Sequence, residues 1–251
     1  MRILRFLYRI YQLFVALPIL VMATLFTAVI TIVFCSLFPH SKVWGYYPAK
    51  IWGMLFCRVL LLPIKVEGKE KIDKKASYVF VANHQGAMDI FLVYALLNHN
   101  FKWMLKKSLR KMPLVGEACY KADFIFVDRS SPRGVKETIA NASEILKDGT
   151  SLMIFPEGSR TFNGKMIPFK NGAFFLADEL QLPVVPLTID GPFDVLPRTK
   201  GVNFVKFGRM RLVIHDVIYP QGRGHDNVKS LSHQSFEAIN SALPDKYRTI
   251  L

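Results

Sequence analysis

The chain is short of acidic residues and of cysteine. Its 251 residues contain 19 Asp and Glu against 33 Lys and Arg, which gives a formal charge of +14. The three cysteines, Cys35, Cys57 and Cys119, are too few and too widely spaced for a disulfide scaffold. Intrinsic disorder is excluded because 51% of the residues are hydrophobic and 13% are aromatic.

Signatures of several other classes of protein are missing from the sequence. It has no Gly-x-Ser-x-Gly element of a serine hydrolase and no glycine-rich phosphate-binding pattern of a nucleotide-binding enzyme. It also lacks His-x3-His and Cys-x2-Cys pairs, so we expect no metal site. The positive charge would suit nucleic acid, but a long apolar segment makes lipid the simpler partner, and we expect no nucleic-acid partner.

That apolar segment contains no Asp, Glu, Lys or Arg from residue 10 to residue 41. As a helix, the 29 residues from 10 to 38 would measure roughly 43 Å, against a hydrocarbon core of about 30 Å. They are long enough to cross a membrane with tilt, or to break at Pro18. A cleaved signal peptide is the competing interpretation, but no small-x-small cleavage site ends the run. We therefore expect a retained anchor.

Basic residues flank the apolar segment on both sides. They are Arg2, Arg5 and Arg9 before it and Lys42, Lys50, Arg58 and Lys65 after it. A single span would put these groups on opposite sides, whereas a hairpin, or helices lying in one leaflet, would keep all of them cytoplasmic. Residues 43–64 mix aromatic side chains with cations, which favours an interfacial position. We predict a membrane anchor over residues 1–64 and a cell-membrane protein with its active site at the cytoplasmic face.

The rest of the chain alternates between short β-branched or aromatic runs and helical patterns. Strands are expected at 77–82, 124–127, 151–155, 184–189 and 211–218, and helices at 132–147, 171–180 and 229–243. This alternation is typical of an α/β layered domain, here over residues 65–251, with a mixed or largely parallel sheet and flanking helices.

The first candidate for chemistry is His84, which Asp89 follows five residues later. On one helix the two would lie about 140° apart and could not meet. With His84 in a loop after a strand and Asp89 in the first turn of the next helix, the carboxylate can reach the imidazole. Such a pair fixes the tautomer and leaves the other ring nitrogen to take a proton. The spacing alone also fits a loop histidine with a local hydrogen bond.

A second group of polar residues, Glu157 to Arg160, directly follows a strongly apolar strand. Open α/β sheets bind ligands at the carboxyl ends of their strands. Gly158 lets a backbone N–H approach a ligand, and Arg160 offers a planar fork that suits phosphate. A structural turn with a Glu–Arg surface pair would have the same sequence. Arg129, which also follows an expected strand, repeats the pattern.

Together these segments resemble the glycerolipid acyltransferase family, typified by the 1-acylglycerol-3-phosphate (lysophosphatidic acid) acyltransferases. Four sequence blocks of that family occur here in order. They are the His-x4-Asp block at 83–89, an apolar run ending in Asp-Arg at 124–129, Phe-Pro-Glu-Gly-Ser-Arg at 155–160 and Val-Pro-Leu-Thr-Ile at 185–189. The similarity spans residues 78–191. Gly86 stands where many members have Ser, and Asp123 lies where a Gly is common.

The resemblance implies a reaction. His84, held by Asp89, would act as general base on an acceptor hydroxyl, which would attack an acyl thioester. The donor would be acyl-CoA or acyl carrier protein, and no cofactor is implied. Lysophosphatidic acid would be the acceptor and phosphatidic acid the product, with other lyso-lipids, such as ornithine or glycine lyso-aminolipids, as alternatives. A membrane lipid-binding protein without activity is the remaining alternative.

The resemblance also implies which residues bind the substrates. The acceptor head group would be held by four residues of one loop, namely Glu157, Gly158, Ser159 and Arg160. Its phosphate would be neutralised by Arg129 and Lys170. Pro186 would shape the acyl-donor side of the site.

Residues 101–112 would be amphipathic as a helix, with apolar side chains on one face and five cations elsewhere. Such a surface attracts anionic head groups, by about 1 kcal/mol per cation near a membrane. A solvated basic face that only aids solubility is the alternative. Membrane lipids are therefore among the expected partners.

Overall fold

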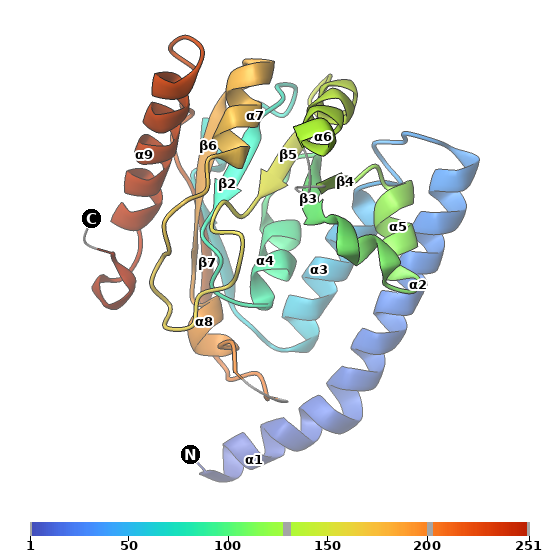
Figure 1. Cartoon of the computed structure of the whole chain (residues 1–251). Helices are drawn as coiled ribbons and strands as arrows, with labels where there is room; N and C mark the ends of the chain where they lie inside the picture. Colours follow the sequence, from blue (N-terminus) through green and yellow to red (C-terminus); the bar gives the residue numbers. More distant parts are fainter. Residues whose placement is uncertain (1, 128–131, 200–202, 250–251) are drawn as a thin grey trace.

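A seven-stranded sheet forms the centre of the molecule, with helices on both of its faces (Figure 1). The computed structural model describes residues 2–127, 132–199 and 203–249, without the side chains of 132–136. The strands are β1 (Ile64–Glu67), β2 (Val79–Ala82), β3 (Phe101–Lys106), β4 (Ile125–Val127), β5 (Ser151–Ile154), β6 (Val184–Asp190) and β7 (Met210–Ile214).

The strands lie in the order β1-β7-β6-β2-β5-β3-β4. Only β6 and β7 pair in antiparallel fashion among the described strands, and the other neighbouring pairs are parallel. This confirms the expected α/β fold with a mixed, mostly parallel sheet. The apolar runs that the sequence shows at β2, β5 and β6 arise because these strands are covered on both faces.

Two hydrophobic layers cover the sheet. On one face, α3 (Tyr47–Val59) and α4 (Met88–Leu96) pack over Phe80 and Phe101. On the other face, α6 (Pro132–Ile145), α7 (Gly172–Leu180) and α9 (His225–Ser241) form the second layer with Val81 and Phe174. The side chains of neighbouring strand residues point to opposite faces, so Phe80 and Val81 enter different layers. Two short helices, α5 (Val115–Lys121) and α8 (Pro192–Val195), lie in the connections.

The N-terminal segment forms one long bent helix along the side of the domain (Figure 1). It consists of α1 (Arg2–Tyr11), a π-helical turn at Gln12–Ala16 and α2 (Leu17–Leu37). The Leu17 N–H binds the carbonyl of Gln12, five residues back. Because Pro18 has no N–H and crowds the preceding turn, this wider turn lets the helix bend and continue through Pro18 instead of breaking there.

The combined helix Arg2–Leu37 has 36 residues and is, within the described parts of the chain, the one helix long and apolar enough to cross a membrane. Only 17% of its most apolar stretch is buried against the protein. The attachment of this helix to a membrane stays a prediction. The predicted division of the chain after residue 64 stays a prediction.

The aromatic residues after this helix turn largely inward. In α3, Trp52 and Phe56 pack on Phe91 of α4, with ring centroids 4.7 and 3.9 Å apart. Gly53 allows this close approach, because a Cβ there would lie 2.6 Å from the Cβ of Tyr94. These side chains therefore pack α3 against α4, and the interfacial position of residues 43–64 stays a prediction.

Residues 101–112 do not form the amphipathic helix that their sequence would allow. Phe101–Lys106 is strand β3, placed between β5 and β4, and a short 3-10 turn at Lys107–Lys111 follows. Phe101 and Trp103 alternate onto one face of the sheet and pack on Tyr94, at 5.1 and 6.0 Å. The Lys102 ammonium is buried and donates to the carbonyl of Ala122, 2.8 Å away, at the end of α5. Pairing with β5 and β4, together with the bond from Lys102 to the C-terminal end of α5, stabilises the strand over an amphipathic helix.

Candidate active site

The site begins where β2 and β5 end side by side. These strands are parallel neighbours, so their carboxyl ends bring residues 83–89 and 155–161 together. The side chain of Asn83 extends the sheet at this point. Its amide donates to the carbonyl of Ile189 at 2.8 Å and accepts from the Ile189 N–H at 2.7 Å. The start of the histidine loop is thereby fixed to β6.

His84 and Asp89 meet as their spacing predicts. The Nδ1 atom of His84 lies 2.7 Å from Oδ2 of Asp89, which is in the first turn of α4 and fully buried. The Gly86 N–H donates to the same oxygen at 2.9 Å. Burial raises the pKa of Asp89, and the hydrogen bonds from His84 and Gly86 act against that rise. With Nδ1 held by the carboxylate, Nε2 is the nitrogen left to exchange a proton with a substrate.

Three further contacts hold His84 in place. Its ring stacks on Phe155, with centroids 3.9 Å apart and planes within 4°. Its backbone N–H donates to Oε1 of Glu157 at 2.7 Å, and its carbonyl accepts from the Thr161 N–H at 3.0 Å. The imidazole is therefore fixed by groups from both strand ends, which is the preorganisation that proton transfer requires.

Glu157 is buried, and its carboxyl group faces the backbone. One oxygen accepts from His84 and the other from the Ile167 N–H at 3.1 Å. Burial raises the pKa of Glu157 to about 8, against these two hydrogen bonds. The carboxyl group of Glu157 thus connects the backbone of the histidine loop to that of Ile167. Contact with an acceptor head group, as the sequence implied, stays a prediction.

The remaining loop residues lie closer to solvent. Gly158 adopts a φ of 74°, and a Cβ there would lie 3.0 Å from Nζ of Lys170, so this ammonium sits over the loop backbone. Ser159 is exposed and Arg160 is half-buried. In the described parts of the chain, neither Arg160 nor Lys170 has a carboxylate partner. Both cations are therefore available to an anion.

Two predicted site residues do not join this group. Arg129 lies outside the described residues. Pro186 is buried in β6 opposite Val81 and is not among the residues that line the cavity described next. It sits at a bulge, because residues 185–186 face residues 215–217 between the paired positions Leu187–Ile214 and Val184–Ile218. Its role on the acyl-donor side stays a prediction.

The family blocks do not include Arg198, which nevertheless lies beside the loop. Its guanidinium donates to the carbonyl of Arg160 at 3.0 Å and covers the exposed ring of Phe162 at 4.0 Å. The signal in the sequence was the basic stretch from residue 198 to residue 211, which gives the charge but not the position.

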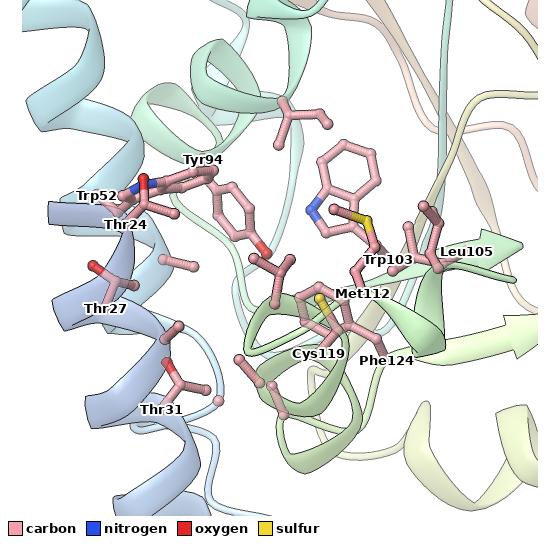
Figure 2. Close-up of a pocket in the computed structure, with 18 of the residues that line it drawn as sticks. Thr24, Thr27, Thr31, Trp52, Tyr94, Trp103, Leu105, Met112, Cys119 and Phe124 are labelled. Carbon is pink, nitrogen blue, oxygen red and sulfur yellow. The ribbon is translucent and has the colours of Figure 1, made fainter. Parts of the chain in front are cut away.

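An apolar cavity of about 420 Å³ adjoins the histidine, within the size range of small-molecule sites. His84 and Phe155 form part of its wall. Figure 2 shows that side chains from several separate elements point into it. They include Thr24, Thr27 and Thr31 of α2, Trp52 of α3, Tyr94 of α4, Trp103 and Leu105 of β3, and Met112, Cys119 and Phe124 from the segment around α5.

The cavity is the feature that sequence reasoning missed. The sequence marked α2 as a membrane segment, yet its threonines and Ala28 form one wall of the cavity. Among the described residues, no group of three or more His, Cys, Asp and Glu could hold a metal ion. The chemistry available here is that of a positioned histidine beside an apolar chamber and a cationic loop.

A histidine with one free ring nitrogen beside an apolar cavity is compatible with an acyl-transferring enzyme on this α/β fold. The acyltransferase family model matches residues 63–190, just over half of the chain, and the chain belongs to that family. The resemblance seen in the sequence blocks is therefore confirmed.

Individual relatives agree. The chain is 32% identical over 219 residues to an uncharacterized acyltransferase of Schizosaccharomyces pombe, covering 86% of this chain and 77% of that protein. It is 31% identical over 180 residues to the 1-acyl-sn-glycerol-3-phosphate acyltransferase of Saccharomyces cerevisiae, covering 70% and 59%. The crystal structure of the 1-acyl-sn-glycerophosphate acyltransferase PlsC from Thermotoga maritima matches with a TM-score of 0.74 and 27% identity, over 95% of each chain.

Proposed function

We propose that this protein is a membrane-bound lysophosphatidic acid acyltransferase. It moves a fatty acyl group from a thioester to the free hydroxyl of lysophosphatidic acid and so makes phosphatidic acid. The observation that carries the proposal is the His84–Asp89 pair, 2.7 Å apart, on the wall of an apolar cavity. The names of the yeast and Thermotoga relatives support this acceptor.

The chemistry follows from the open nitrogen of His84. Nε2 takes the proton of the acceptor hydroxyl as its oxygen bonds to the thioester carbonyl carbon. The tetrahedral intermediate then collapses, the carbon–sulfur bond breaks, and the imidazolium returns the proton to the leaving thiolate. Asp89 stabilises the imidazolium and keeps the ring oriented. Because a thiolate already leaves readily, positioning and base catalysis supply most of the acceleration.

A direct transfer is favoured over a covalent acyl-enzyme. Cys119 is the cysteine that lines the cavity, but burial raises the pKa of its thiol to about 11. A thiol with this pKa is almost wholly protonated near neutral pH and is a poor nucleophile. The acyl group therefore passes straight from the donor sulfur to the acceptor oxygen.

The cavity is the proposed site of the acyl chain. Its lining of Trp, Tyr, Phe, Leu and Met side chains suits a hydrocarbon, whose transfer from water is worth about 0.8 kcal/mol per buried CH₂. The thioester carbonyl would then lie at His84, with the coenzyme A or carrier-protein portion outside. Acyl-CoA and acyl carrier protein both fit this arrangement.

The acceptor phosphate is assigned to the cationic loop. Arg160 and Lys170 lack carboxylate partners in the described parts of the chain, and the Lys170 side chain lies over the backbone of Gly158. Arg129, which follows β4 in the sequence, is proposed as a third cation for this phosphate. An acceptor carboxylate, as in a lyso-aminolipid, is the second candidate, because the same cations would bind it.

Membrane attachment is assigned to the outer face of the long N-terminal helix. Phe14, Met22 and Phe26 are 64–70% exposed on an uncharged part of this helix. Replacing Phe14 and Phe26 together with Asp should release the protein from vesicles while leaving the cavity wall intact. Deleting the helix would be a poorer test, because α2 also lines the cavity. Undiminished pelleting of the double variant with vesicles would contradict this assignment.

The activity is tested by thiol release from purified protein in detergent. Palmitoyl-CoA is the first donor, acyl carrier protein the second, and lysophosphatidic acid and a lyso-aminolipid are parallel acceptors. Release that requires lysophosphatidic acid supports the proposal. Thiol release with the aminolipid alone would identify an aminolipid, and not lysophosphatidic acid, as the acceptor. The absence of thiol release with both donors would refute the proposed activity.

A further inference from the structure

Gln12 is a polar residue buried inside the otherwise apolar N-terminal helix. Its side chain is 7% exposed. Both the nitrogen and the oxygen of its amide form hydrogen bonds with the backbone of one residue in a distant segment. The amide donates to the carbonyl of Val205 at 2.8 Å, and its oxygen accepts from the Val205 N–H at 2.9 Å. The partners are 193 residues apart in sequence, so the contact joins the N-terminal helix to a segment late in the chain.

The helix is distorted at this residue. Gln12 begins the π-helical turn Gln12–Ala16, and such wide turns are frequent at functional sites. Arg9, one turn earlier, lies over the ring of Phe204 at 5.5 Å. A carboxamide buried in an apolar segment without partners is costly, so its exact match to Val205 is a specific connection between the helix and residues 203–206.

From Val205 the contacts continue to the histidine loop. The Lys206 N–H donates to the carbonyl of Val195, at the end of α8, at 2.8 Å. The next carbonyl, that of Leu196, lies against Gly86, where a Cβ would come within 3.0 Å of it. Gly86 in turn donates to the catalytic-pair carboxylate of Asp89 at 2.9 Å. Residues 195–196 therefore pack directly against the loop that carries His84.

We propose that Gln12 is a positioning residue for the transfer reaction. By fixing residues 203–206, it holds residues 195–196 against the histidine loop. The position of the N-terminal helix on the domain thereby affects the geometry of His84 and Asp89. If the helix moved away from the domain, residues 195–196 would no longer be held against the histidine loop. Full turnover therefore requires the helix to be packed on the domain. The proposal rests on the proposed acyl transfer, and it gives the N-terminal helix a part in turnover beyond attachment.

The test compares Gln12→Met with Tyr8→Phe in the full-length protein. Met has a similar length and no hydrogen-bonding amide. Tyr8 also connects the helix to the domain, through a hydrogen bond from its hydroxyl to the carbonyl of Leu60 at the end of α3. Both variants delete contacts of the same helix, but only Gln12→Met should affect the histidine loop.

Two readouts are measured on both variants. The kcat of Gln12→Met should fall about tenfold with little change in either KM, since misplacement far from the chemistry can cost up to about 10²-fold. The kcat of Tyr8→Phe should stay near that of the wild type. In hydrogen exchange, peptides covering 83–89 and 203–206 should exchange faster in Gln12→Met alone.

The exchange readout does not depend on activity. If the wild-type protein transfers no acyl group, the proposed function fails, and faster exchange at 83–89 still supports the connection. The proposal is overturned if Gln12→Met and Tyr8→Phe match in both kcat and exchange. It is also overturned if Gln12→Met changes kcat while exchange at 83–89 stays that of the wild type.

Discussion

The backbone N–H of His84 donates a hydrogen bond to Oε1 of Glu157 over 2.7 Å, although 73 residues separate them in sequence. The loop that carries Glu157 also binds the other side of the histidine peptide, through the N–H of Thr161. The buried carboxyl thus acts on the histidine through its backbone. We infer that the shape of the His84 loop depends on this contact as well as on Asp89.

Glu157→Gln should flatten part of the pH dependence of stability. Burial raises the pKa of Glu157 to about 8 in the folded protein, from an ordinary value of 4.5. Because the folded state holds this proton more tightly than the unfolded chain does, the free energy of unfolding should fall as the pH rises from about 4.5 through about 8. Gln cannot titrate, so the variant lacks this contribution.

Chemical denaturation across that pH range measures the effect. Glu70→Gln is the matched control, because Glu70 is exposed in a 3-10 turn, and it should keep the wild-type slope. Parallel stability profiles for the wild type and Glu157→Gln would show that Glu157 takes up no proton in this range.

Asp89→Asn should abolish most of the activity while the fold is retained. The amide of Asn can donate to Nδ1 of His84, which would move the ring proton to Nε2 and block the base. We expect kcat to fall about 10³–10⁴-fold with little change in KM, as for other histidines deprived of their carboxylate. Asp226→Asn, in the first turn of α9, serves as control. A loss of less than about threefold would exclude the proposed use of the pair.

Ala28→Phe should change which acyl donors are used. Ala28 is 6% exposed and lines the cavity, whereas its neighbour Val29 is 48% exposed on the outer face of α2. A phenyl ring at residue 28 fills part of the cavity, so kcat/KM for palmitoyl-CoA should fall about tenfold while that for octanoyl-CoA is kept. Val29→Phe should leave both unchanged. An equal loss with both donors would indicate general damage instead of a filled acyl site.

Arg160→Ala should weaken binding of the acceptor more than that of the donor. A charge-assisted hydrogen bond to phosphate is worth about 1.5–3 kcal/mol, so the KM for lysophosphatidic acid should rise about ten- to a hundredfold. Arg223→Ala is the control, because Arg223 contacts only the remote carbonyl of Glu179 in the described structure. A rise confined to the KM of the thioester would move Arg160 to the donor side.

The parts of the site that the sequence predicts are those encoded locally. His84 and Asp89 meet because a strand-to-helix turn of fixed length separates them, and this length is visible in the sequence. The parallel sheet is likewise signalled by apolar runs, since its central strands are buried on both faces.

Contacts between distant segments were not predictable in the same way. The cavity takes its walls from α2, α3, α4, β3 and the α5 region, so no single stretch displays it. The strand at Phe101–Lys106 was not among the expected strands, and the buried contact of Lys102 with Ala122 is not visible in the sequence. Both the cavity and this strand depend on which segments pack together in the folded protein.

The central claim is that His84 is the base of an acyl transfer to lysophosphatidic acid. It is tested most directly by thiol release from palmitoyl-CoA, measured for the wild type and His84→Ala with and without that acceptor. The account predicts acceptor-dependent release by the wild type and a loss of about 10²–10⁴-fold in the variant, with folding unchanged. Release by His84→Ala within about threefold of the wild type would contradict it, because such a small loss falls outside the range expected for removal of a general base.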